Sequence, residues 1–166
     1  MRKSKKVAVL GLCTALALIL AYVEAMIGPL IPSIPGIKMG LPNIIIIFLL
    51  YRKGALSAIG VSLVRVILVS ILFGNVVALS YSLAGAALSL AVMVLLQKLG
   101  IMSEVGVSVA GGVTHNLGQI LMAMLLLETS ELGYYMVVLT VTGTVAGILI
   151  GLCGSLLIRK IPPKIL

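Results

Sequence analysis

Polar side chains that could bind a ligand gather in one apolar stretch, residues 111–119. It contains the chain's single histidine, His115, together with the amides of Asn116 and Gln119. No charged side chain lies between residues 105 and 127, so in a bilayer each polar group there needs a partner or a cavity. At helical spacing His115 and Gln119 lie one turn apart on one face, with Asn116 at its edge. The side chains on this face could either line a ligand site or form a polar contact that holds two helices together, and the spacing leaves both interpretations open.

A second candidate is Arg65, which lies inside the hydrophobic run 54–73. An arginine within a membrane span costs at least about 2.5 kcal/mol on insertion scales, so it should pair, face a polar interior or extend to the interface. Glu24, near the end of the first apolar run, is the acidic side chain available to pair with it. Arg65 therefore either forms an internal pair with Glu24 or holds an anionic group of a substrate.

The composition predicts the environment that positions these residues. Apolar residues make up 61% of the 166 residues and charged residues only 10%, against roughly 25% in an average soluble domain. We therefore expect an integral membrane protein, a single transmembrane domain over residues 1–166. The net charge of +8 comes from short basic clusters between apolar runs, a pattern that orients membrane proteins and gives no reason to expect nucleic acid as a partner. Cys13 and Cys153 lie in apolar runs without metal-ligand spacing, so neither a metal site nor a cofactor is expected.

The hydrophobic runs predict an all-α protein of six transmembrane helices. The second helix is the least secure, because residues 41–51 extend only roughly 16 Å at about 1.5 Å per residue. It must begin near Gly36 or be re-entrant. The connection before it, residues 28–40, holds three prolines and three glycines but little charge, which makes it a candidate lid over a cavity. The expected spans are about 7–27, 36–51, 54–73, 76–96, 107–127 and 134–158.

Basic residues predict the orientation of these spans. With six spans, Lys38 alone falls on one side and Arg65 lies within the membrane. This asymmetry predicts that both termini are cytoplasmic. The basic residues on the cytoplasmic side are Arg2, Lys3, Lys5, Lys6, Arg52, Lys53, Lys98, Arg159, Lys160 and Lys164.

Small residues at spacings of three and four mark helix faces that allow close approach. In the first span, Ala8, Gly11 and Ala15 form such a face, which could dock a partner protein or a neighbouring helix of the bundle. In the last span the corresponding residues are Gly143, Gly147, Gly151 and Gly154.

Four short motifs are distributed along the chain. They are GIKMGLPN at 36–43, LFG at 72–74, SLAG at 82–85 followed by LS at 88–89, and THNLGQ at 114–119. Together they resemble the Gx transporter family, often labelled heptaprenyl diphosphate synthase component I, and the resemblance covers nearly the whole chain. This family is in turn similar to the substrate-binding S components of energy-coupling factor (ECF) importers.

The resemblance implies an S-component-like bundle in the plasma membrane that captures a small cofactor or precursor beneath its first loop. Its partners would be a transmembrane T subunit, which docks on a small-residue surface of the first helix such as Ala8, Gly11 and Ala15, and two cytoplasmic ATPases. The S-component site lies toward the outer side, which favours Glu24, Lys38, Asn43 and Asn75 as substrate-binding residues, with Arg65. It lowers the expectation that His115, Asn116 and Gln119 contact the solute.

The family's other label raises a second function. A prenyl diphosphate synthase holds magnesium through aspartate-rich motifs, and this sequence contains no aspartate. We therefore expect no enzyme activity, but a membrane accessory that tethers a polyprenyl synthase or presents a lipid is an alternative. A third possibility is a carrier without ATPases, which would need internal symmetry that the sequence does not display.

Overall fold

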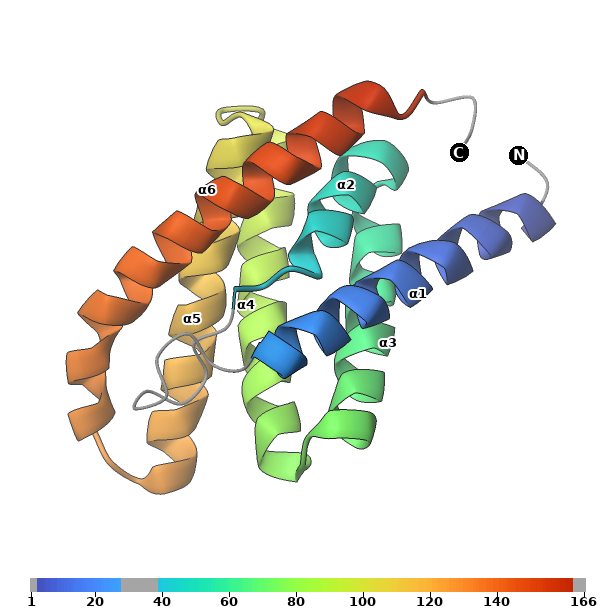
Figure 1. Cartoon of the computed structure of the whole chain (residues 1–166). Helices are drawn as coiled ribbons and strands as arrows, with labels where there is room; N and C mark the ends of the chain where they lie inside the picture. The colour runs from blue at the N-terminus through green and yellow to red at the C-terminus, as the bar shows by residue number, and fades with distance from the viewer. Residues whose placement is uncertain (1–2, 28–38, 163–166) are drawn as a thin grey trace.

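The computed structural model describes residues 3–27 and 39–162, and these form an all-helical bundle (Figure 1). No strand occurs in the described ranges. Five helices are long and apolar enough to cross a membrane, which indicates a multi-pass membrane protein. The helices are α1 (Lys3–Ile27), α2 (Asn43–Lys53), α3 (Ala55–Phe73), α4 (Val76–Leu99), α5 (Glu104–Leu127) and α6 (Met136–Lys160), with a short 3₁₀ helix, η1 (Glu131–Tyr135), before α6.

Helix α2 differs from the expected second span at its start. The sequence predicted a helix from about residue 36, but residues 39–42 form a turn, and α2 begins at Asn43. Gly40 has φ 75°, outside the helical region, and its carbonyl accepts a hydrogen bond from the Asn43 amide at 2.8 Å. Pro42 also restricts Leu41 to a non-helical conformation. The eleven residues of α2 are too few to cross a bilayer of about 30 Å, and α2 is not among the five candidate spans.

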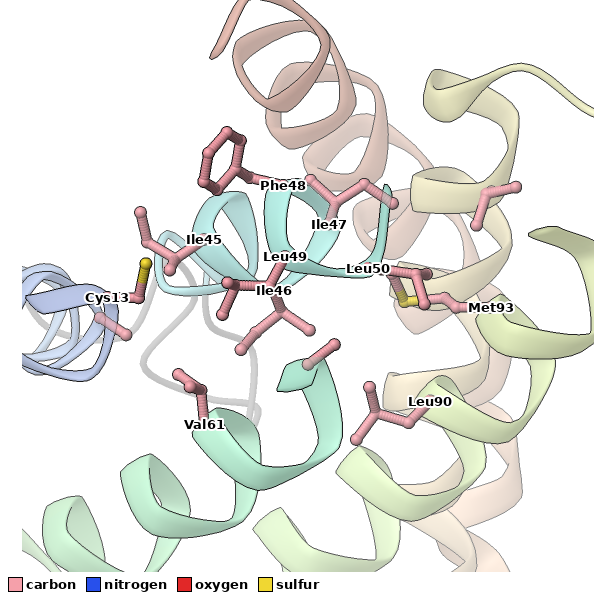
Figure 2. Close-up of a cluster of buried hydrophobic side chains, with 13 residues drawn as sticks. Cys13, Ile45, Ile46, Ile47, Phe48, Leu49, Leu50, Val61, Leu90 and Met93 are labelled. Carbon is pink, nitrogen blue, oxygen red and sulfur yellow. The ribbon is translucent and has the colours of Figure 1, made fainter. Parts of the chain in front are cut away.

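Helix α2 is apolar on all sides and is enclosed by the other helices. Six consecutive residues, 45–50, are buried, which is the expected position for a helix without a polar face. Figure 2 shows Ile45 on the side of Cys13 of α1, Ile46 on the side of Val61 of α3 and Leu50 beside Met93 of α4. Val107 of α5 belongs to the same buried cluster. The core of the protein is therefore centred on α2.

Helix α5 packs very closely between α4 and α6. A Cβ atom on Gly118 would lie 2.7 Å from the Ala84 carbonyl oxygen of α4. On the opposite side, a Cβ on Gly112 would lie 2.5 Å from the Gly143 carbonyl oxygen of α6. The predicted close approach of α6 through its glycines is thus confirmed, and α4, α5 and α6 form a tightly packed set. Helix α1 instead packs on α3 and α2 (Figure 1).

One end of the bundle collects basic residues. Arg52, at the end of α2, donates hydrogen bonds from Nη2 to the carbonyl oxygens of Ile158 and Ile161 at the end of α6, the latter at 3.0 Å. These carbonyls carry the partial negative charge of the α6 C-terminus, so a guanidinium is favourable there. The first turn of α1 and the last turn of α6 lie at the same end of the bundle (Figure 1). The cytoplasmic location of this end stays a prediction from charge.

We expect Gly147→Ala to destabilise the bundle, because the added Cβ would lie 2.6 Å from the Val109 Cα atom of α5. Overpacking against backbone should lower the free energy of unfolding by about 1–3 kcal/mol, measured by denaturant titration in micelles. Gly60→Ala is the matched control, since a Cβ there meets nothing within 4 Å, and its unfolding energy should stay unchanged or rise by up to about 1 kcal/mol. Equal stability of the two variants would contradict the close contact of α5 with α6.

Candidate functional site

The start of α2 is held to the end of α1 by a buried carboxylate. Glu24 is only 8% exposed, and its Oε1 atom accepts a hydrogen bond from the Gly40 backbone amide at 2.5 Å. Gly40 itself is closely surrounded, since a Cβ on it would lie 3.1 Å from Asn43 Nδ2 and 3.2 Å from Ile150 Cδ1 of α6. Three helices, α1, α2 and α6, therefore meet around this one glycine.

Arg65 of α3 belongs to the same region. Its guanidinium lies within the electrostatic influence of the Glu24 carboxylate. Its Nε atom is buried, yet it has no hydrogen-bond partner. The buried residues of the same helix include both serines and apolar side chains, among them Ser62, which is 2% exposed, and Val66. Glu24, Asn43 and Arg65, which the sequence predicted as substrate-binding residues, are thus linked through Glu24 and Gly40 near the start of α2.

The polar cluster of α5 divides between two neighbouring helices. His115 and Gln119 face α4, where a Cβ on Gly85 would lie 3.0 Å from His115 Cε1 and 2.9 Å from Gln119 Cγ. Asn116 faces α6 and is buried, and its Nδ2 donates to the Leu139 carbonyl oxygen at 2.8 Å. The amide of Asn116 therefore holds α5 to α6 through this hydrogen bond. His115 and Gln119 are half-buried beside the closest contact with α4.

The remaining predicted site residues lie elsewhere. Asn75 is exposed and caps α4, since its Oδ1 accepts from the Ala78 amide at 2.8 Å, which gives it a local structural role. Lys38 and most of the predicted lid, residues 28–38, lie outside the described residues.

The predicted docking face of α1 is open. Ala8, Gly11 and Ala15 are all exposed, and a Cβ on Gly11 would meet nothing within 4 Å. The opposite side of α1, with Cys13, Ala17 and other small residues, is buried against the bundle. Within the described residues, the face formed by Ala8, Gly11 and Ala15 does not serve packing of the bundle.

Two structural contacts were not predicted from the sequence. The Gly40 amide is a backbone group, and its pairing with Glu24 joins residues far apart in the chain. The Arg52 contact with α6 was also missed, because Arg52 in the sequence is simply one basic residue in a cluster. Only the position of Arg52 at the end of an apolar run could have suggested that it meets a helix C-terminus.

We expect Glu24 and Arg65 to be energetically coupled. Arg65→Met should destabilise the protein, because it removes a positive charge that acts on the buried Glu24 carboxylate. The double variant with Glu24→Gln should recover about 0.5–3 kcal/mol of that loss, measured by thermal unfolding of all three variants and the wild type. A double variant no more stable than Arg65→Met would show that the two charges do not support each other.

Comparison with known proteins assigns the chain to a family. The model described as heptaprenyl diphosphate synthase component I matches residues 13–157. Neither the search of curated proteins nor that of solved structures finds a significant match. The matched segment runs from α1 to α6 and includes Glu24, Asn43 and Arg65. The chain belongs to this family, the Gx transporter family.

Proposed function

We propose that the chain is the substrate-binding subunit of an ATP-driven importer of the ECF type, similar to an S component, for a small cofactor or precursor. The observation that carries the proposal is Arg65, whose buried Nε donor has no partner although the arginine lies in an apolar helix bundle. Arg52 also has a buried Nε without a partner, but it lies at the end of α2 and donates from Nη2 to two carbonyl oxygens of α6, whereas Arg65 lies near the middle of a helix long enough to cross a membrane.

The site would lie at the start of α2, where α1, α2 and α6 meet around Gly40 and α3 supplies Arg65. Helix α2 begins inside the bundle, so its first turn is positioned to contact a solute held among the longer helices. The tightly packed helices α4, α5 and α6 would form the fixed part of the carrier. In this proposal the basic end of the bundle faces the cytoplasm, and the chain resides in the plasma membrane.

The open face of α1 supports a protein partner. Small exposed residues allow a second helix to approach closely in a membrane, where packing is a main source of helix association. A transmembrane T subunit would dock there and connect the chain to two cytoplasmic ATPases. These ATPases would supply the energy for release of the solute.

The family description favours one other function. A component of a heptaprenyl diphosphate synthase that is not itself catalytic could hold the synthase at the membrane. In that case the function of the bundle would be to bind a soluble protein, and no small solute would be retained. The two functions therefore differ in what purifies with the chain.

Native mass spectrometry of the gently purified chain tests the proposal. We expect one bound small molecule per chain, and we expect Asn43→Ala to reduce its occupancy, because Asn43 lies beside Gly40 at the proposed site. Asn75→Ala is the matched control, since Asn75 is exposed and caps α4. An empty chain that purifies in fixed ratio with a soluble prenyl synthase would contradict the importer function and favour the accessory function.

The docking face gives a separate prediction. Gly11→Leu and Ala15→Leu should each reduce co-purification of a T subunit at least about tenfold, because a bulky side chain separates helices that pack through small residues. Solute occupancy should remain at the wild-type level. Gly60→Leu on the open face of α3 controls for a bulky residue at another exposed glycine. Normal co-purification of both α1 variants would show that the T subunit docks elsewhere.

A further inference from the structure

We infer that the transported solute carries an anionic group, a carboxylate or a phosphate, and that the guanidinium of Arg65 binds this group directly. The inference rests on the proposed solute-binding function and specifies the chemical class of the solute. It is carried by the geometry around Arg65 and by a comparison with Arg52, the other half-buried arginine whose Nε atom is buried and without a partner.

The first argument concerns the unpaired donor. Arg65 lies near the middle of α3, a helix of 19 residues that is long and apolar enough to span a membrane. A buried donor without an acceptor is unfavourable, and more so when the group is charged. Arg52 also has a buried Nε without a partner, but its Nη2 atom donates to two carbonyl oxygens of α6. The buried Nε of Arg65 lies in the membrane-length part of the bundle, so an acceptor from a bound molecule would complete its hydrogen bonding.

The second argument concerns Glu24. Its negative charge acts on the Arg65 guanidinium. One of its carboxylate oxygens, however, accepts the short hydrogen bond from the Gly40 amide. Glu24 thus acts as a positioning residue that fixes the start of α2 and leaves Nε of Arg65 unpaired.

The third argument concerns the type of acceptor. Arginine is always charged in proteins, and its planar group of N–H donors matches the oxygen pair of a carboxylate or phosphate. Charge-assisted hydrogen bonds of this kind are roughly twice as strong as neutral ones. The buried surroundings at α2 are apolar, so the rest of the solute should be largely apolar.

An anionic lipid headgroup shares this chemistry with an anionic solute. The test therefore compares wild type, Arg65→Gln and Arg159→Gln, each purified and then exchanged into nanodiscs of phosphatidylcholine alone. Arg159→Gln removes the same charge from an exposed position in the last turn of α6. Molecules that remain bound are released and identified by mass spectrometry, and their ratio to protein is measured.

The expected result is a non-lipid carboxylate or phosphate compound bound to wild type and Arg159→Gln. Its ratio to protein should fall at least about tenfold in Arg65→Gln, the loss expected from a charge-assisted hydrogen bond. If Arg65→Gln does not fold, Arg65→Lys replaces it, because lysine keeps the charge but lacks the planar donors. Loss of the anion in Arg65→Lys supports the inference, and wild-type retention contradicts it.

Other outcomes separate this inference from the proposed function. An uncharged solute, or an anion bound equally by Arg65→Gln, overturns the inference and leaves the importer function in place. An anionic phospholipid lost only in Arg65→Gln supports an anion site at Arg65 but counts against the importer function. If every preparation is empty, the chain is titrated with 1-naphthyl phosphate, 1-naphthoate and uncharged 1-naphthamide. Thermal stabilisation by the two anions alone, absent in Arg65→Gln, supports the inference, and any other pattern overturns it.

Discussion

The short buried helix α2 is the constraint on which the rest of the bundle depends. Its buried residues 45–50 give it no polar face, and its length does not allow it to cross a bilayer. It must therefore be enclosed by longer helices, and side chains from α1, α3, α4 and α5 complete the cluster around it. Because α2 begins inside the bundle, the turn that precedes it at Gly40 is also drawn to the interior. This explains how a backbone amide from a connection comes to meet the buried carboxylate of Glu24.

Polar groups in this bundle follow the rule that a membrane protein must satisfy them internally. Asn116 binds a carbonyl oxygen of α6, Ser89 donates to the Gly111 carbonyl oxygen at 2.8 Å, and Arg52 binds the end of α6. Each of these contacts joins two helices. Arg65, like Arg52, has a buried Nε without a partner, but it lies near the middle of a membrane-length helix and within the influence of a carboxylate that is already bonded to backbone. We therefore place the candidate ligand site at the start of α2 and not at the histidine cluster of α5.

Membership of the family described as heptaprenyl diphosphate synthase component I is compatible with either a carrier or an accessory role. The bundle has features that suit a carrier. Helix α5 approaches α4 on one side and α6 on the other through glycines, so closely that little adjustment at either contact is possible. Helix α1 packs mainly on α3 and leaves its face of small residues open. A rigid half and a more loosely attached helix with an open face would suit a subunit that binds a solute and then moves against a partner.

Much of the architecture was predictable from the sequence, because hydrophobic runs of membrane length are a local property. The helical class, the membrane environment and the limits of the five long helices agree with the prediction to within a few residues. The candidates Glu24 and Arg65 were recognisable because charges are rare in such runs. The start of α2 was misplaced, since the conformation at Gly40 is set by its packing against Asn43 and Ile150.

Only the tertiary structure decided which polar side chains bond to other parts of the protein and which could contact a ligand. The sequence placed His115, Asn116 and Gln119 on one face, but the helices on either side assign Asn116 to α6 and the other two to α4. It offered a Glu24–Arg65 pair, and the fold adds a hydrogen bond from the Gly40 amide to one oxygen of Glu24. Such choices depend on contacts between residues distant in the chain, and spacing along a helix carries no information about them. The sequence alone thus determined the helices and the rare polar groups, while packing determined their partners.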